Sequence, residues 1–229
     1  MVLTPSQAKT FYGRFGSKQD AQAFYEDAAI DDLIAHASLE QAETVFELGC
    51  GTGRLALRLL SEQLPPSASY LGIDVSQTMI DLAKHRLLPF SERAKVERSD
   101  GSMRFPLPDH SVDRFVSTYV FDLLSDQDIR DAIREAHRVL KPGEKLCLAS
   151  LTGGITPVSR VVSALWSLTF RLRASPVGGC RPIRLASYLE RHAWSVDYRS
   201  VVVRFGISSE VLVATSSSAP DPDAKKGPD

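Results

Sequence analysis

The chain has 229 residues with 27 basic and 28 acidic side chains, a formal net charge of -1 and a hydrophobic content of 43%. This composition excludes an intrinsically disordered chain, and the balanced charge leaves no broad basic face for nucleic acid. Three widely spaced cysteines, Cys50, Cys147 and Cys180, form no CxxC pair and therefore indicate neither a disulfide framework nor a zinc site.

The cellular location is predicted from apolar runs that the sequence lacks. Residues 1–16 contain no apolar core of a signal peptide, and no run of about 18 uncharged apolar residues follows. Together with the cysteine usage, this favours a reducing cytoplasm and a protein that neither is exported nor spans a membrane. The five histidines are scattered without metal-ligand spacing, so no metal site is expected.

The sequence pattern divides the chain into three segments: a helical one, one in which strands and helices alternate, and a polar one. Residues 1–40 are helical in pattern, residues 41–215 alternate β-branched apolar runs with stretches of helical period, and residues 216–229 favour a disordered tail. The predicted strands cover residues 44–48, 70–73, 95–98, 114–120, 145–151, 194–204 and 207–215.

The connections between these strands predict the fold. Helices between the first five strands imply parallel pairing through right-handed crossovers, whereas Gly206 leaves room only for an antiparallel hairpin between the last two. The predicted class is therefore α/β. We expect a Rossmann-like, doubly wound, seven-stranded sheet that is mostly parallel with one antiparallel edge strand, with helices on both faces.

The clearest predicted helix covers residues 126–140, whose apolar residues fall on one face. Ser125 followed by Asp128 resembles a capping box at its start, and the sequence LysProGly closes it.

A glycine-rich turn, GCGTG, follows the first predicted strand and its acid Glu47, and precedes a helix that begins near Arg54. Glycines there let the chain turn sharply, and the amides at a helix start donate to an anionic group. Gly49 and Gly51 match the dinucleotide pattern G-x-G-x-x-G, but Arg54 occupies its last position and Gly53 comes one place early. The turn therefore departs from a pyrophosphate cradle.

Two further acids end the next two predicted strands. Asp74 lies about 20 residues beyond the turn, where a carboxylate accepts hydrogen bonds from both ribose hydroxyls. Asp100 ends the third strand and is placed to accept a hydrogen bond from an adenine amino group.

In this order and spacing, the motifs resemble those of the class I S-adenosylmethionine-dependent methyltransferases, over roughly residues 11–215. The resemblance implies that the glycine turn binds the methionine part of the cofactor. Residues 105–124 look like the family's active-site strand, and residues 135–146 look like the following helix and turn. Glu144 replaces the family's usual second glycine there, a departure expected to affect only the turn.

The resemblance implies S-adenosylmethionine as cofactor and S-adenosylhomocysteine as product. Tyr12 belongs to a segment, residues 11–27, that resembles a lid over the cofactor in the small-molecule branch; alternatively, its aromatic residues pack the first helix on the sheet. The implied cofactor-binding residues are Tyr12, Glu47, Gly49, Cys50, Gly51, Gly53, Arg54, Asp74, Val75, Met79, Asp100, Gly101, Ser102 and Tyr119.

Transfer from a sulfonium needs little dedicated catalytic machinery, because the methyl group is already activated and must chiefly be aligned with its acceptor. The candidate catalytic residues are Tyr119, at the end of the fourth predicted strand, and Asp122, just after it. Asp122 serves as base or substrate anchor, or alternatively is an ordinary acid at a helix entry. No Asp/Asn-Pro-Pro-Tyr sequence follows that strand, which argues against the amide and adenine N-methyltransferases that the family resembles.

The stretch from residue 145 to 189 contains no acid, and within it residues 157–173 read as an amphipathic helix. One interpretation is a crossover helix with a solvated basic face. The other is a substrate cap, an insertion at about 152–184, which suits an apolar, anionic or lipid acceptor at a membrane surface. In the second case we expect Trp166 and Arg181 to contact the substrate, Arg181 through an anionic group.

The predicted function is direct in-line methyl transfer to a small-molecule or lipid-like acceptor, similar to the quinone-biosynthesis and phospholipid methyltransferases. Expected partners are this acceptor, a peripheral membrane contact and at most a weak homodimer, without nucleic acid. Three alternatives stay open. An RNA or DNA methyltransferase is disfavoured by the balanced charge, and only the basic segment after the fifth predicted strand supports it. An NAD-dependent oxidoreductase is disfavoured by Arg54, and a non-catalytic cofactor-binding partner protein is disfavoured by the acids Glu47, Asp74 and Asp100.

Overall fold

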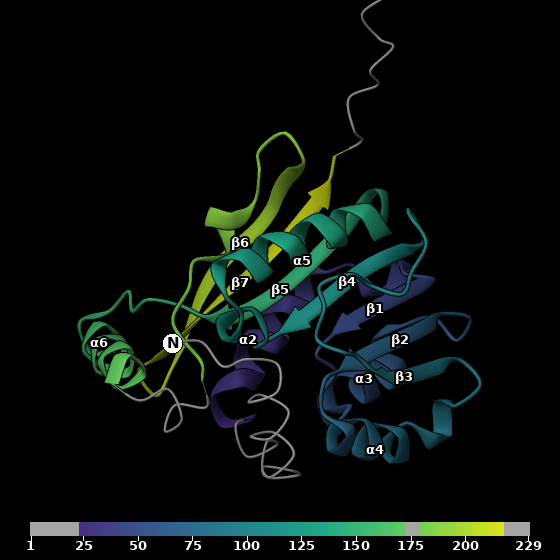
Figure 1. Ribbon diagram of the computed structural model, residues 1–229, viewed down its shortest axis with the longest axis horizontal. Coiled ribbons are helices and arrows are strands. Elements are labelled where there is room, and N and C mark those ends of the chain that lie inside the picture. Colours follow the sequence, from purple (N-terminus) through teal and green to yellow (C-terminus); the bar gives the residue numbers. More distant parts are fainter. Residues whose placement is uncertain (1–22, 173–178, 218–229) are drawn as a thin grey trace, which may run out of the picture.

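The computed structural model describes residues 23–172 and 179–217. Seven strands form one sheet in the order β3-β2-β1-β4-β5-β7-β6 (Figure 1). Strands β1 to β5 are parallel, and β7 is antiparallel to both of its neighbours, so the predicted sheet is confirmed. The strands are β1 (Thr44–Leu48), β2 (Ser69–Asp74), β3 (Ala94–Arg98), β4 (Val112–Thr118), β5 (Leu140–Leu151), β6 (Trp194–Arg204) and β7 (Ile207–Ser216).

The predicted hairpin of β6 and β7 is present, with its turn at Phe205 and Gly206, whose φ angles are 52° and 79°. The reversed strand β7 lies between β5 and β6, so β6 is the edge strand. Pairing with β7 on one side and β4 on the other buries most of β5.

Helices cover both faces of the sheet, as predicted (Figure 1). Alternate strand residues point to opposite faces: Val116 packs with α2, α3 and α4, whereas Phe115 packs with α5 and η7. Helix α6 stands apart at one end of the sheet. The helices are α2 (Ala23–His36), α3 (Arg54–Arg58), α4 (Gln77–Arg86), α5 (Asp126–Val139) and α6 (Pro157–Leu172), with short turns η2 (Leu39–Gln41), η3 (Leu59–Gln63), η4 (Leu88–Phe90), η5 (Phe121–Leu123) and η7 (Leu185–Tyr188).

Several element boundaries differ from the prediction for local reasons. The strand expected over residues 114–120 ends at Thr118, because Tyr119 takes a left-handed backbone conformation with φ 56°. Helix α5 ends at Val139, and β5 starts immediately at Leu140 rather than at residue 145. In the part of the chain that the structure describes, no helix has the length and apolarity to cross a bilayer.

Glu144 does more than shape its turn, which corrects the expectation from sequence. Its carboxylate pairs with the buried guanidinium of Arg114. The same guanidinium donates hydrogen bonds to the carbonyl oxygens of Ala37 and Ser38, both at 2.7 Å. Glu144 therefore neutralises an arginine that joins β4 to the chain after α2, because a buried cation needs a partner.

Candidate functional site

The glycine turn joins β1 to α3 at the carboxyl edge of the sheet. Gly49, Gly51 and Gly53 all take positive φ angles, at 78°, 51° and 75°, which favour glycine. A Cβ atom on Gly49 would lie 2.2 Å from Cγ2 of Val120, so the turn also approaches the segment after β4 too closely for a side chain. The turn is tied to β2, since the amides of Gly49 and Cys50 donate to Ile73 O at 2.8 and 3.0 Å.

Asp74 lies at the end of β2 and holds the glycine turn through its carboxylate. Its oxygens accept hydrogen bonds from the amides of Gly51, at 3.1 Å, and Ser76, at 2.8 Å. Burial raises the pKa of this carboxyl, and the backbone hydrogen bonds oppose the rise. Val75 follows directly, and Met79 is fully buried in the first turn of α4, which Ser76 caps.

Glu47 is fully buried on β1 and accepts a hydrogen bond of 2.6 Å from the hydroxyl of Tyr70. Burial raises the pKa of Glu47 to about 7, with the Tyr70 hydrogen bond acting in the opposite direction. A cation beside the Glu47 carboxyl would favour its ionised form.

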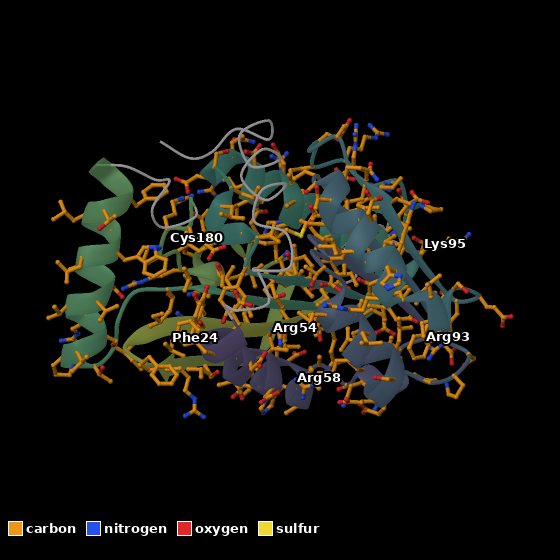
Figure 2. All side chains as sticks on the ribbon, turned by 90° about the horizontal axis from the view of Figure 1, so that it is seen from below. Phe24, Arg54, Arg58, Arg93, Lys95 and Cys180 are labelled. Atoms are coloured by element: carbon orange, nitrogen blue, oxygen red, sulfur yellow. The ribbon has the colours of Figure 1, made fainter. Side chains whose placement is uncertain are left out.

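A cavity of about 60 Å³ brings the glycine turn, Glu47 and Tyr119 together with α2. Arg54 faces α2, where its guanidinium lies 2.5 Å from Asp27 and 3.8 Å from Glu26 (Figure 2). Burial raises the pKa of Glu26 to about 7, and Arg54 opposes the rise. The cavity is lined by Glu26, Ile30, Glu47, Gly49, Cys50, Gly51, Thr52, Arg54, Leu55, Thr118 and Tyr119.

Five residues that line the cavity are absent from the sequence-based prediction: Glu26, Ile30, Thr52, Leu55 and Thr118. Glu26 precedes the glycine turn by more than 20 residues, and only the docking of α2 on the sheet brings it to Arg54. The sequence of α2 gives no clear signal for Glu26, because the helix carries a second acid pair, Asp31 and Asp32.

An aromatic and apolar cluster adjoins the cavity. The rings of Tyr25 and Tyr119 lie 5.8 Å apart at right angles, and Tyr119 donates a 2.9 Å hydrogen bond to Ser209 Oγ. Trp166 of α6 donates through Nε1 to Cys180 O at 3.0 Å. The cluster consists of Tyr25, Leu151 and Cys180, packed against Tyr119, Leu123, Trp166 and Ile207.

The side chain of Asp122, on η5, is completely buried. Its Oδ2 lies 3.4 Å from the amide of Leu151, and its Oδ1 has no hydrogen-bond partner among the described residues. Burial raises the pKa of Asp122 to about 7. Arg181 contacts the segment around Asp122. Its amide donates a hydrogen bond to Asp122 O at 3.0 Å, and its guanidinium lies 2.7 Å from the carboxylate of Asp126.

Asp100, Gly101 and Ser102 follow β3 at the same edge of the sheet. The exposed Asp100 carboxylate accepts a 2.8 Å hydrogen bond from the amide of Ser102, which lowers its pKa. Tyr12 lies outside the described residues. Within residues 23–172 and 179–217, no cluster of three or more His, Cys, Asp or Glu side chains could hold a metal.

A larger groove, of about 650 Å³, lies between α5 and the start of β6. Its lining includes Arg130, His137 and Trp194, and none of the predicted site residues. The larger groove therefore contains none of the predicted chemistry, whereas the smaller cavity contains the glycine turn and Glu47.

Comparison with protein families and curated proteins agrees with this geometry. A family model described as a methyltransferase domain matches residues 45–143. The chain is similar to a malonyl-acyl-carrier protein O-methyltransferase of Marinomonas sp., with 31% identity over 166 residues, 69% of this chain and 59% of that protein. It is also similar to a ubiquinone/menaquinone biosynthesis C-methyltransferase of Geobacter sulfurreducens, with 31% identity over 59% of this chain and 50% of that protein. The chain matches 50% to 59% of the length of these relatives.

Solved structures share the fold. The cyclase SpnF has a TM-score of 0.71 at 19% identity, over 94% of this chain and 98% of that chain. A methyltransferase described as S-adenosylmethionine-dependent, from Methanosarcina mazei, has a TM-score of 0.64 at 22% identity, over 80% of this chain and 97% of that chain. At these identities the likeness shows the architecture alone.

Proposed function

The chain belongs to the S-adenosylmethionine-dependent methyltransferases, and we propose that it transfers the cofactor's methyl group directly to a small, apolar or lipid-like acceptor. The observation that carries this proposal is the meeting of the glycine turn, Glu47 and Tyr119 in one cavity beside an aromatic cluster. The similarity to methyltransferases favours this function over an NAD-dependent oxidoreductase.

The chemistry of the cavity fits the cofactor. The methionine part carries an ammonium and a carboxylate, which match the acids Glu26 and Glu47 and the guanidinium of Arg54. An ammonium beside these acids favours their ionised forms, although burial raises the pKa of both to about 7. Asp74 is the acid for the ribose hydroxyls, and Asp100 the acceptor for the adenine amino group.

When bound, S-adenosylmethionine supplies a methyl group already activated on a sulfonium. The residues of this chain therefore bind the cofactor, align the acceptor with its methyl group and exclude water. Tyr119, with its hydroxyl held by Ser209, forms the wall between the cavity and the aromatic cluster. Asp122 acts as a positioning residue, because its buried carboxylate contacts the amide of Leu151.

The aromatic and apolar cluster around Trp166 favours an apolar acceptor. Burial raises the pKa of the Tyr25 and Tyr119 hydroxyls, so neither titrates near neutral pH. A wall of neutral aromatic and aliphatic groups favours a flat or chain-like apolar acceptor over a charged amine.

The role of Arg181 toward an anionic substrate group is tested by two substitutions. Arg181→Ala is expected to raise the Michaelis constant of the true acceptor, while Asp126→Asn, which removes the ion-pair partner, leaves that constant unchanged. If Arg181 only ties its loop to α5, both variants lose stability and neither changes the Michaelis constant.

Cofactor binding is tested with S-adenosylhomocysteine by calorimetry. Asp74→Asn is expected to raise the dissociation constant about tenfold or more, because charge-assisted hydrogen bonds to the ligand are lost. Asp81→Asn is the matched control on the exposed side of α4 and leaves binding unchanged. Tight NAD binding without S-adenosylhomocysteine binding contradicts the proposal.

Methyl transfer is tested with labelled S-adenosylmethionine and a panel of a long-chain quinol, a phenol, a primary amine and RNA. The expected result is transfer to the quinol or the phenol. Transfer only to the amine or RNA contradicts the acceptor class, and cofactor binding without any transfer favours a non-catalytic partner protein. A cytoplasmic location and at most a weak homodimer stay predictions.

A further inference from the structure

Helix α6 has two sides that differ in their packing. One side faces the protein, where Ser159 is buried and Trp166 donates to Cys180 O. The other side faces solvent and is apolar: four side chains at helical spacing are between 53% and 67% exposed, namely Val158, Val161, Leu165 and Leu168. Figure 2 shows α6 at the edge of the molecule, with one side toward Cys180 and the other away from it.

The apolar side of α6 continues onto neighbouring segments. Phe205, in the turn between β6 and β7, is 77% exposed and its ring lies 5.5 Å from the ring of Phe24. The turn packs on α6, since a Cβ on Gly206 would lie 3.0 Å from Val162. We call this surface the α6 patch; it consists of Phe24, Ile155, Val158, Val161, Leu165, Leu168 and Phe205.

The α6 patch holds seven of the nine exposed large apolar side chains in the described part of the chain. Such side chains are normally scattered singly over a surface, whereas a gathered set marks an interaction site. The other two, Leu88 and Val196, lie on different elements.

The exposed charges beside α6 and the hairpin turn are positive, and the acids that follow Phe24, namely Glu26 and Asp27, are paired with Arg54. No acid occurs between residues 145 and 189, and Arg160 and Arg204 are exposed beside the patch. Neither arginine has an ion-pair partner among residues 23–172 and 179–217. A second copy of the chain would bring like charges together in a symmetric contact, whereas an anionic lipid surface would neutralise them.

We propose that the α6 patch docks the protein on an anionic lipid bilayer, with α6 lying in the plane of the interface. The inside of the same helix contributes Trp166 to the aromatic cluster beside the cofactor cavity. An apolar acceptor therefore passes from the bilayer to the cluster along α6. This deepens the proposed function and rests on it for the acceptor, but not for the docking itself.

The test measures binding of the full chain to vesicles of phosphatidylcholine alone and of phosphatidylcholine with phosphatidylglycerol. The chain is expected to bind the anionic vesicles. Leu165→Glu is expected to weaken this binding about tenfold or more, because the exposed leucine that enters the lipid is replaced by a charge. Leu88→Glu is the matched control, since Leu88 is 59% exposed on η4 and Leu165 is 60% exposed.

Two further variants distinguish the charge-dependent part of the docking from cofactor binding. The unmodified chain is expected to bind neutral vesicles more weakly than anionic ones. Arg160→Glu is expected to weaken only the binding to anionic vesicles. Asp74→Asn is expected to bind vesicles like the unmodified chain, so a failure of cofactor binding leaves the docking testable by itself.

Three outcomes overturn the proposal. One is the absence of binding to anionic vesicles. Another is equal binding by the Leu165→Glu and Leu88→Glu variants. The third is a concentration-dependent dimer that Leu165→Glu abolishes, without vesicle binding, which assigns the α6 patch to a second copy of the chain.

Discussion

At the scale of single residues, the glycine turn depends on Gly49 for both its backbone conformation and its close approach to Val120. Gly143 has a similar φ of 83°, but a Cβ there would meet nothing within 4 Å. The two glycines therefore separate backbone strain from steric clash.

Gly49→Ala is expected to lower the free energy of unfolding by about 2–4 kcal/mol and to weaken S-adenosylhomocysteine binding, because strain and overpacking add. Gly143→Ala is expected to cost only about 1–2 kcal/mol and to leave binding unchanged. Urea unfolding and calorimetry measure the two effects. Equal losses of stability in both variants would contradict a role for the contact with Val120.

Asp122 offers a second test, in the pH dependence of stability. Burial raises its folded-state pKa from 3.8 to about 7, so the folded protein binds this proton more tightly than the unfolded chain. The stabilising contribution of the protonated group is complete below about pH 4 and is lost as the pH rises to 7. Asp122→Asn removes this dependence, because an amide does not titrate.

The free energy of unfolding of Asp122→Asn, relative to the unmodified chain, is expected to rise with pH by roughly 1 kcal/mol per unit between about pH 4 and 7. Asp126→Asn is the control of opposite sign. Hydrogen bonds from Tyr188 and Arg181 lower the pKa of Asp126, so that variant loses relative stability as the pH rises at the acidic end. A flat difference for Asp122→Asn would show that this carboxylate ionises normally.

At the scale of elements, α5 is the helix whose ends the sequence predicts best. Ser125 Oγ accepts a 3.1 Å hydrogen bond from the amide of Asp128 and donates to its carboxylate at 2.6 Å, which confirms the predicted cap. The apolar face of α5 packs on the sheet through residues such as Ile129 and Ile133.

Ser125→Ala is expected to lower the free energy of unfolding by about 1 kcal/mol, because an amide at the helix start loses its acceptor. Ser125→Thr keeps a hydroxyl at the same position and is expected to recover most of the loss. Thermal unfolding monitored by circular dichroism measures both. No loss in the alanine variant would mean that solvent replaces the cap.

At the scale of the whole molecule, stability is expected to differ between the middle and the edges of the sheet. β5 and β7 are buried and paired on both sides, whereas β3 is an edge strand with mostly exposed residues. Local opening at such an edge requires little loss of buried apolar surface.

Amides of β5 and β7 are therefore expected to exchange with solvent only on global unfolding, and those of β3 through local opening. S-adenosylhomocysteine is expected to slow exchange in residues 49–53 and to leave α6 unchanged, which distinguishes the cofactor site from the α6 patch. Hydrogen exchange followed by mass spectrometry measures both effects. Uniform exchange along the chain would contradict this division.

The features that depend on neighbours along the chain can be predicted from the sequence. Alternation of apolar residues predicts strands and their two faces, Gly206 predicts a hairpin, and the glycines of the turn, with Asp74 and Asp100, predict a nucleotide-like cofactor site. These signals are local, because backbone conformation and side-chain periodicity act over a few residues.

The contacts between segments distant in sequence emerge only from the folded chain. It inserts β7 between β5 and β6, brings Glu26 to Arg54, buries Asp122 and turns one side of α6 to solvent. Periodicity shows that a helix such as α6 has an apolar arc, but not which part of that arc a neighbour covers. That depends on the packing of the complete chain, because burial of apolar surface is non-directional and is satisfied by whichever element the fold brings alongside.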